Sequence, residues 1–165
     1  AGVNDSKQVS ESERARLYEV IVARARGIGV GVATEQEIDR FNILEATRLA
    51  MRRALASLNP PADCLLIDAV TLSNLAIPSR SIIKGDTLSI SIAAASIVAK
   101  VTRDRMMAAY HRTYPLYNFL SHKGYGTEEH LQRLAQHGPC AIHRRTFAPV
   151  AQLLSGLGEC PGTTL

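Results

Sequence analysis

The sequence lacks the features that mark several large classes of protein. Its 165 residues include three cysteines with no close pair, Cys64, Cys140 and Cys160. Neither a disulfide framework nor a zinc cluster is therefore indicated, and a reducing compartment is favoured. The longest apolar run, about 90–99, ends at Lys100 and is too short to cross a membrane. The chain also has no P-loop and no GxSxG or GxGxxG motif, so the common nucleotide-binding and hydrolase signatures are absent.

What is present is the composition of an ordinary globular protein. The chain is 46% hydrophobic and 21% charged, with 11 glycines and 7 prolines, which excludes collagen-like, low-complexity and disordered classes. We predict one domain over 1–155 and a flexible tail over 156–165. The chain opens Ala1-Gly2-Val3-Asn4 without an initiator Met or the regions of a signal peptide. A trimmed protein, a proteolytic product and a partial gene would each explain this start.

The net charge of +4 is small, but its distribution is uneven. Between positions 100 and 145 there are eight Lys or Arg residues against three acids. All five histidines fall in the same window, and none has the spacing of a metal site: His111, His122, His130, His137 and His143. A basic segment of this kind suits a polyanion such as a nucleic acid backbone, and a solvated helical face is the alternative.

Capping boxes and hydrophobic periodicity predict an α/β protein. Ser10–Glu13 and Thr34–Glu37 each begin a helix, and Asn59-Pro60-Pro61 ends the second one. The helices are expected at 11–26, 35–58, 89–114, 128–137 and 150–154, and the strands at 27–33, 64–67 and 81–83. The first strand alternates glycine with other residues, which predicts close approach by other backbone. The second is continuously apolar, which predicts burial on both faces.

Two acids are the leading candidates for chemistry. Asp68 follows the apolar strand and so lies at the carboxyl edge of the predicted sheet, where open α/β folds bind ligands. It can also merely cap the next turn. Asp104 lies between two arginines on a predicted helix whose preceding turns are rich in small residues. A charge-balanced exposed face would explain it, but such a helix can also approach the sheet and bring the two carboxylates to one divalent metal ion.

Basic and aromatic side chains in loops suggest contacts with a nucleic acid. Lys7, Lys84 and Lys123 each lie beside Ser or Gly, a setting that suits phosphate contacts, although each can be a plain surface lysine. Tyr125 lies between two glycines. Flanking glycines expose a ring that can stack on a sugar or a base, and the alternative is a ring packed on its own loop.

Taken together, these motifs resemble the bacterial type 2 ribonuclease H family, ribonuclease HII. The matching blocks occur in the family's order and with its spacing: Gly2-Val3-Asn4-Asp5-Ser6-Lys7, Ile38-Asp39, Asn42 to Thr47, Leu66-Ile67-Asp68-Ala69, Lys84-Gly85-Asp86, Ile92 to Asp104, His122 to Thr127 and His143 to Phe147. The long block that ends in Asp104 is highly specific. The resemblance implies a ribonuclease H-like mixed sheet flanked by helices.

The resemblance also implies an activity. It is that of an endonuclease that cleaves the RNA strand of RNA–DNA hybrids and nicks duplex DNA 5′ to a single embedded ribonucleotide. Such enzymes use Mn²⁺ or Mg²⁺, leave 3′-hydroxyl and 5′-phosphate ends, and act in the cytoplasm on replication primers and misincorporated ribonucleotides. We expect a monomer that binds nucleic acid and no membrane.

Residue by residue, the resemblance implies roles for seven positions. Asp68 and Asp104 correspond to the third and fourth metal-binding carboxylates. Tyr125 corresponds to the ring that packs on the deoxyribose after the ribonucleotide and so senses the RNA-to-DNA junction. The expected backbone contacts are Ser6 and Lys7, followed by Lys84 and Lys123. Ala69 stands where many members have Gly, a departure expected to disturb little.

One family motif is not found in this sequence. The family's first strand carries Asp-Glu-Ala-Gly-Arg-Gly, which supplies two metal ligands and grips the ribonucleotide 2′-hydroxyl; the 165 residues contain no such segment. We therefore expect the first two strands of the fold to be missing, the edge at 64–67 to be unpaired, and this polypeptide alone to be poorly folded and inactive.

Two other interpretations remain open. A non-catalytic module would keep the basic face and Tyr125 and bind RNA–DNA hybrids without cutting them. Its affinity would depend on salt and would survive a chelator, whereas cleavage requires a divalent ion. An unrelated basic α/β protein, in which Asp68 is only a turn residue, is the weaker alternative because it leaves the ordered motifs unexplained.

Overall fold

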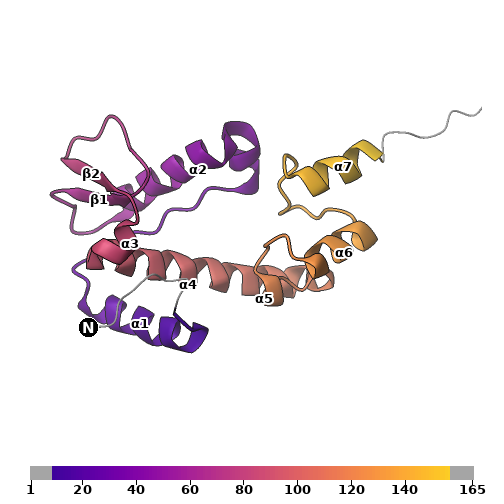
Figure 1. Cartoon of the computed structure of the whole chain (residues 1–165), viewed down its shortest axis with the longest axis horizontal. Coiled ribbons are helices and arrows are strands. Elements are labelled where there is room, and N and C mark those ends of the chain that lie inside the picture. The colour runs from indigo at the N-terminus through magenta and orange to yellow at the C-terminus, as the bar shows by residue number, and fades with distance from the viewer. Residues whose placement is uncertain (1–8, 157–165) are drawn as a thin grey trace, which may run out of the picture. The chain divides into compact units, whose positions relative to one another are not determined.

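The computed structural model of the protein describes residues 9–156 and contains both helices and strands, as the sequence predicts (Figure 1). In chain order the elements are α1 (Glu11–Arg24), α2 (Glu35–Ser57), β1 (Leu65–Asp68), β2 (Ser79–Ile82), α3 (Gly85–Leu88), α4 (Ile90–Thr113), the 3₁₀ helix η1 (Pro115–Tyr117), α5 (Phe119–His122), α6 (Glu128–His137) and α7 (Ala148–Gly156). No helix in this described part is both long and apolar enough to span a membrane.

The chain divides into two compact units. Within the described residues, the first comprises 9–32 and 47–103, and the second comprises 33–46 and 104–156. One domain over 1–155 with a tail over 156–165 stays a prediction, and residues 157–165 lie outside the described part.

In the first unit, α1 packs along α4, as Figure 1 shows. The Ser10 hydroxyl accepts a hydrogen bond from the Glu13 amide, so the predicted cap is formed. The Glu13 carboxylate pairs with Arg16. The buried face of α1 contributes Leu17 to a cluster with Ile97 and Val101 of α4. A small apolar core thus fixes these two helices against each other.

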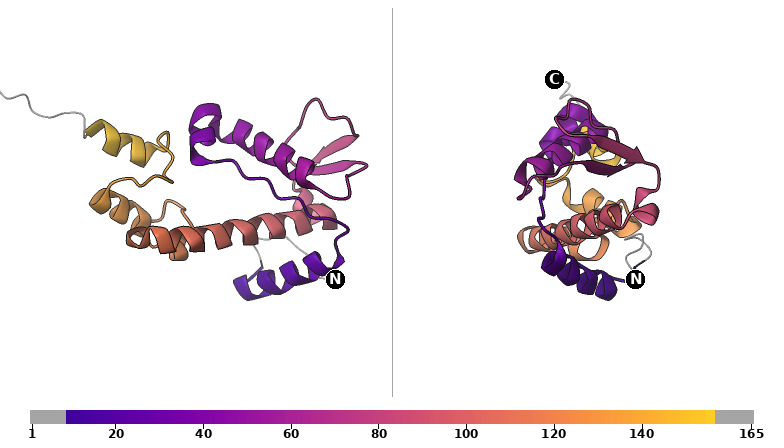
Figure 2. Two further views of the ribbon diagram at one scale, coloured as in Figure 1. Left: turned by 180° about the vertical axis from the view of Figure 1, so that it is seen from behind. Right: turned by 90° about the vertical axis from the view of Figure 1, so that its left-hand side faces the viewer.

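The segment 27–33 is not a strand, so that prediction is wrong. It runs extended beside the second half of α2 (Figure 2), and helix side chains bind its carbonyls: Arg53 donates to Val32 O at 2.7 Å and Ser57 to Val30 O at 3.4 Å. The expected close approach of other backbone is confirmed, since a Cβ on Gly29 or Gly31 would overlap a carbonyl oxygen of α2. Glycine therefore serves close packing against a helix here.

The sheet of this unit is small. β1 and β2 pair in parallel, with Leu65 opposite Ser79 and Asp68 opposite Ile82. The prediction that the strand at 64–67 is buried on both faces is wrong: Ile67 is buried, but Leu66 is 45% exposed. Within residues 9–156, β2 is the sole strand paired with β1, which leaves the other edge of β1 unpaired.

In the second unit, α2 begins with the capping box that the sequence predicts. The Thr34 amide donates to the Glu37 carboxylate at 2.9 Å, and the Glu37 amide donates to the Thr34 hydroxyl at 3.2 Å. The predicted helix is not continuous, because Asn42 has φ 70° and ψ 167°. Its side chain accepts from the amides of Leu44 and Glu45 and so caps the helical turns that follow the kink.

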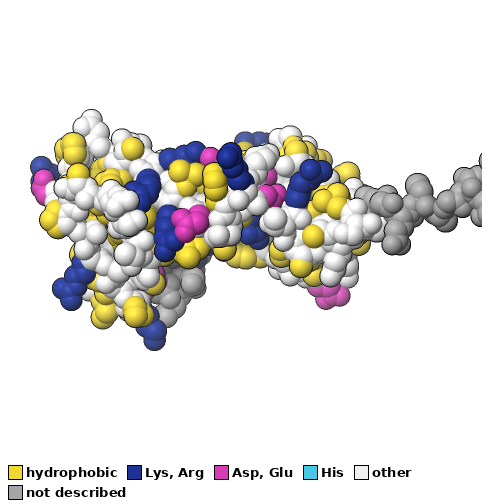
Figure 3. Space-filling view, turned by 90° about the horizontal axis from the view of Figure 1, so that it is seen from above, with side chains coloured by type: hydrophobic (Ala, Val, Ile, Leu, Met, Phe, Trp, Pro, Cys, Tyr) yellow, Lys and Arg dark blue, Asp and Glu magenta, His cyan; other side chains and the backbone are white. Residues whose placement is uncertain are grey.

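The core of the second unit is aromatic and aliphatic. The largest fully buried side chains are Phe119, Leu134 and Val150, at 1% exposure or less, and Tyr117 stacks on Phe119 with ring centroids 5.4 Å apart. Helix α6 occupies the predicted range 128–137. The Thr127 hydroxyl caps its start, and Gly138, with φ 70°, follows its end. On the face shown in Figure 3, hydrophobic side chains also lie exposed among charged ones.

Candidate nucleic-acid interface and metal ligands

Asp68 occupies the predicted position at the end of β1. Its carboxylate oxygen Oδ1 accepts a hydrogen bond of 2.8 Å from the amide of Gly85, the first residue of α3. The side chain is exposed, and the bond to Gly85 orients the carboxylate without enclosing it. An exposed, oriented carboxylate at a strand end has the geometry of a ligand for a hard cation such as Mg²⁺ or Mn²⁺.

A basic residue, Lys84, directly precedes the residue whose amide donates to Asp68. Lys84 is exposed, has φ 55° and directly precedes Gly85. Ala69, directly after Asp68, has φ 55° as well. A left-handed conformation costs an alanine about 1 kcal/mol, which is the physical reason why glycine suits this position. The Ala69 departure noted from the sequence therefore falls on a strained backbone position.

Asp104 lies on α4, in a half-buried position of the second unit. The helix around it is regular, as the sequence predicts. Asp68 and Asp104 fall in different compact units, and their convergence on one metal ion stays a prediction. Within residues 9–156, no group of three or more His, Cys, Asp or Glu side chains is arranged to hold a metal ion. The two aspartates are oxygen donors of the type that Mg²⁺ and Mn²⁺ prefer, and their two carboxylates alone supply only part of a full ligand set.

Tyr125 is presented by a tightly hydrogen-bonded loop of the second unit. Its side chain is 55% exposed. Its backbone is fixed at both ends, because its amide donates to His122 O at 2.9 Å and its carbonyl accepts from the Thr127 amide at 2.8 Å. The loop turns through positive φ values at Lys123 and Gly124. The prediction of an exposed ring is thus confirmed, and its role in stacking stays a prediction.

The lysines and the serine predicted to contact a nucleic acid backbone lie in different settings. The Lys123 ammonium donates to Leu120 O at 2.6 Å, which caps the end of α5 and leaves the residue half-buried. Lys84 extends from the loop next to Asp68, as described above. Ser6 and Lys7 lie outside the described residues. All four contacts with a nucleic acid backbone remain predictions.

Sequence reasoning missed the role of Asp39. Its carboxylate accepts hydrogen bonds from the Arg145 amide at 2.7 Å, the Thr146 amide at 2.9 Å and the Thr146 hydroxyl at 2.6 Å. Partial burial would raise the pKa of Asp39, but these bonds and the nearby Arg144 hold that pKa below its usual value. The bonds tie the first turns of α2 to the loop before α7. Because the partners are over 100 residues apart in the chain, no local pattern could have revealed them.

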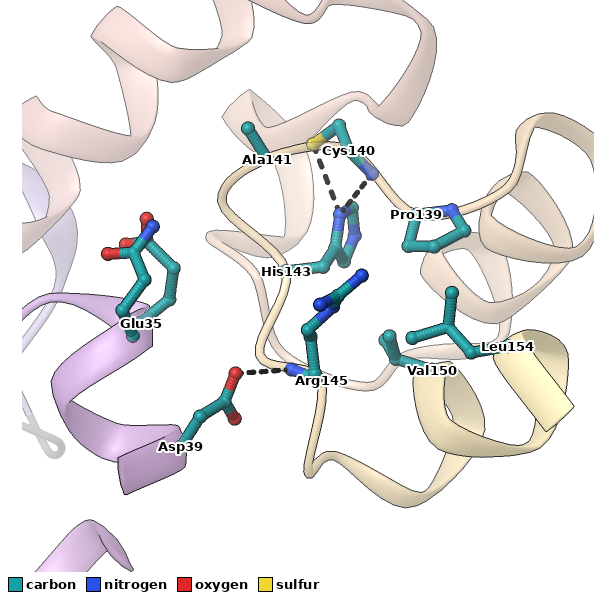
Figure 4. A pocket seen from close by; sticks show the side chains of 10 residues that line it. Glu35, Asp39, Pro139, Cys140, Ala141, His143, Arg145, Val150 and Leu154 are labelled. Carbon is teal, nitrogen blue, oxygen red and sulfur yellow. Dashed lines mark hydrogen bonds between the residues drawn. The ribbon is translucent and has the colours of Figure 1, made fainter. Parts of the chain in front are cut away.

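A pocket of about 380 Å³ lies beside this junction in the second unit (Figure 4). Asp39, Arg145 and His143 line it, together with Glu35 and Cys140. Figure 4 shows the His143 ring turned toward Cys140. Burial raises the pKa of the Cys140 thiol, so the thiol keeps its proton near neutral pH and is not activated as a nucleophile.

Comparison with known proteins agrees with the residues described above. The family model for ribonuclease HII matches residues 1–150. The ribonuclease HII of Chloroflexus aurantiacus is 52% identical over 159 residues, which cover 96% of this chain and 75% of that protein. The Bacillus subtilis ribonuclease HII is 52% identical over 149 residues, which cover 90% of this chain. The chain spans 58% of the length of that relative.

A solved structure supports the fold independently. The crystal structure of ribonuclease H2 from Pyrococcus horikoshii OT3 superimposes with a TM-score of 0.77, covering 94% of this chain and 81% of that chain at 24% sequence identity. At that identity the match concerns the fold alone. Together, the family model over nine-tenths of the sequence and the relatives at about half identity show that this chain belongs to the ribonuclease HII family.

Proposed function

We propose that the protein is an endonuclease that hydrolyses the RNA strand of RNA–DNA hybrids and nicks duplex DNA 5′ to a single ribonucleotide, with Mn²⁺ or Mg²⁺ as cofactor. The observation that carries the proposal is the exposed Asp68 carboxylate, held at the end of β1 by the Gly85 amide in a chain of this family. The substrates are RNA primers and misincorporated ribonucleotides, so the enzyme serves DNA replication and ribonucleotide excision repair. It acts in the cytoplasm as a monomer.

Each residue has a distinct task in this proposal. Asp68 and Asp104 hold the divalent ions, which, when bound, activate the attacking water and stabilise the leaving oxygen. Lys84, beside the strand end, and Lys123 neutralise phosphates of the substrate backbone, and Ser6 and Lys7 do the same in the N-terminal segment. Tyr125 packs its exposed ring on the sugar that follows the ribonucleotide and so selects the RNA-to-DNA junction.

The activity of the 165-residue chain by itself is a separate part of the proposal. Two-metal hydrolysis requires more carboxylates than Asp68 and Asp104, and the family's Asp-Glu-Ala-Gly-Arg-Gly segment is not found in this sequence. The 165-residue chain alone is expected to cleave weakly or not at all.

The test uses an extended protein, defined as this full chain preceded by the N-terminal segment of a family member that carries Asp-Glu-Ala-Gly-Arg-Gly. With Mn²⁺ and a duplex containing one ribonucleotide, the extended protein should nick 5′ to the ribonucleotide. Asp68→Asn and Asp104→Asn should each reduce the cleavage rate about 10³-fold, because loss of one charged ligand removes several kcal/mol of metal-assisted stabilisation. Asp63→Asn is the matched control, since Asp63 is an exposed acid five residues before Asp68.

Unchanged cleavage in Asp68→Asn would overturn the assignment of that carboxylate. The second candidate function is a hybrid-binding module without catalysis, which would use the exposed Tyr125 ring and the exposed Lys84. It predicts binding that weakens with salt and survives EDTA, with no cleavage by the extended protein in either metal.

A further inference from the structure

Three buried histidines in the second unit have no task in the function proposed above. His122, His130 and His143 are each less than 10% exposed and come from α5, α6 and the loop before α7. The ring of His122 stacks on that of His130 with centroids 4.3 Å apart. Burial of three imidazoles costs free energy unless their nitrogen atoms are hydrogen bonded, so their partners are informative.

Each ring nitrogen of the three has a partner. His122 contacts Tyr117 O through Nε2 at 2.7 Å and the Gly124 amide through Nδ1 at 3.2 Å. His130 contacts Tyr125 O through Nδ1 at 2.8 Å and His143 Nε2 through its own Nε2 at 3.1 Å. The Nδ1 of His143 accepts from the Cys140 amide at 3.0 Å. No lone pair remains for a metal ion, and the cluster is a hydrogen-bond network.

The backbone groups at its two ends fix the direction of this network. The Cys140 amide can only donate, so Nδ1 of His143 accepts and its proton lies on Nε2. That proton is donated to Nε2 of His130, whose own proton therefore lies on Nδ1 and is donated to the Tyr125 carbonyl. Both rings are neutral, because an added proton on either would bring two N–H groups face to face. The pKa of each is accordingly lowered, mainly by burial.

The acceptor at the far end of this chain belongs to the proposed junction-sensing residue. The Tyr125 carbonyl accepts from His130 and from the Thr127 amide, while Gly124, directly before Tyr125, donates to His122. The loop is held at its backbone, and the ring of Tyr125 stays exposed. The network therefore affects the position of the Tyr125 ring, and its own side chains do not contact a ligand.

We infer that His130 and His143 are positioning residues that fix the Tyr125 loop for junction recognition, through one directed chain of hydrogen bonds from the Cys140 amide to the Tyr125 carbonyl. This inference rests on the proposed function, in which Tyr125 reads the RNA-to-DNA junction. In this inference His130 and His143 do not touch the nucleic acid. They set the position of Tyr125, which does.

The test measures junction discrimination by the extended protein in EDTA at constant salt. Discrimination is the ratio of affinities, from fluorescence anisotropy, for a duplex with an RNA-to-DNA junction and for an all-DNA duplex of the same sequence. Tyr125→Ala should reduce this ratio about tenfold, the size of one lost stacking contact. His143→Leu, which removes the donor to His130, should reduce it to a similar extent.

Conservative variants separate positioning from general loss of structure. His143→Gln keeps an acceptor and a donor, so it should retain the ratio within about twofold. His130→Asn keeps the donor to Tyr125 O but loses the acceptor for His143, so it should lose part of the ratio. His130→Leu should lose it. His137→Leu is the control, because His137 is an exposed histidine at the end of the same helix and lies outside the network.

The outcomes distinguish the inference from the function on which it rests. If Tyr125→Ala loses discrimination and His143→Leu keeps it, the positioning inference is overturned and the role of Tyr125 stands. If Tyr125→Ala keeps it, the proposed role of Tyr125 fails. The positioning inference, which rests on that role, then fails with it. Where a leucine variant does not fold, the ¹⁵N NMR tautomers decide the inference. A proton on Nδ1 of His130 and Nε2 of His143 supports the chain of bonds, and the opposite tautomers overturn it.

Discussion

The two compact units of this protein hold their functional candidates in opposite ways. In the first, Asp68 ends a strand with one open edge within residues 9–156, and large apolar side chains nearby in the chain are exposed, with Ile83, Leu88 and Ile90 above 70%. In the second, Tyr125 lies on a loop whose backbone is bonded to the buried His122 and His130, next to a core in which Phe119 is 1% exposed. The Asp68 carboxylate thus lies on a sparsely covered sheet. The Tyr125 ring lies on a loop whose base is buried and hydrogen bonded.

The positions of these two side chains are therefore set in different ways. In the proposed function, the Asp68 carboxylate would gain its final geometry from the ion and the other ligands, and a single hydrogen bond from Gly85 orients it beforehand. A stacking ring receives no such help from its ligand, because a base or sugar face tolerates lateral shifts. Its position has to be built into the protein, and in our inference the buried network supplies it.

The largest effect is expected where the first unit is tightly packed. In Gly31→Ala the new Cβ would overlap the Ala50 carbonyl oxygen, and separating the 27–33 segment from α2 should lower the free energy of unfolding by about 3 kcal/mol. Urea unfolding of the extended protein measures this, and hydrogen exchange should rise in α2 more than in α6. Gly156→Ala is the control, because nothing lies within 4 Å of a Cβ there. Equal unfolding midpoints for the two variants would refute the close packing.

An intermediate effect is expected from acid on the second unit. Burial, and secondarily the neighbouring His130, lowers the pKa of His143 to about 4 from an unfolded value of about 6.5. Between these values the unfolded chain binds the extra proton, so stability falls as pH decreases below about 6.5. The loss at pH 5 should be about 2 kcal/mol, measured by urea unfolding of the extended protein at a series of pH values.

His143→Gln provides the control for this pH dependence, because it should remove the part of the loss that His143 contributes. Other titratable groups around the network are Tyr117 on η1, His122 on α5, Glu129 with its partner Arg133 and His130 on α6, Cys140 in the following loop, and Glu35 on α2. A stability profile that is the same for His143→Gln and for the unsubstituted protein would contradict the neutral, buried state of this ring.

The smallest effect sharpens the comparison at the strand end. Ala69 adopts φ 55° directly after Asp68, so Ala69→Gly should raise the free energy of unfolding by about 1 kcal/mol. Ala94→Gly, in the interior of α4, should lower it by about the same amount and is the control of opposite sign. Thermal unfolding of both variants gives the comparison. A decrease in both would show that the left-handed turn at Ala69 carries no strain.

Much of the fold was predictable because its signals are local. Ser10, Thr34 and Thr127 begin helices since their hydroxyls satisfy amides three residues later, and the proline after Thr113 ends α4 for an equally local reason. The strand at 27–33 was wrong, because alternation of glycine does not say whether the neighbouring backbone is a strand or a helix. The kink at Asn42 was missed. An asparagine within a helical pattern caps the turns that follow it only when its own backbone leaves the helical conformation, and the sequence does not show that.

In the candidate site, too, the local features were predictable and the long-range contacts were not. The sequence placed Asp68 at a strand end, Asp104 on a helix and Tyr125 in a glycine-bounded loop, and each has that setting. It gave no sign of the bonds from Asp39 to Arg145 and Thr146, or of the contact between His130 and His143. These contacts join segments brought together by packing, and no short-range spacing encodes them.

Residue order by itself determined the helix starts, the acid that closes an apolar strand and the family motifs, since each depends on neighbours within a few positions. Tertiary structure alone decided which carbonyls the glycines at 27–31 meet, which backbone groups Asp39 binds and which ring nitrogens of the buried histidines face each other. The physical reason is that hydrogen-bond direction and steric contact depend on where remote atoms finally lie, and only the folded chain fixes that.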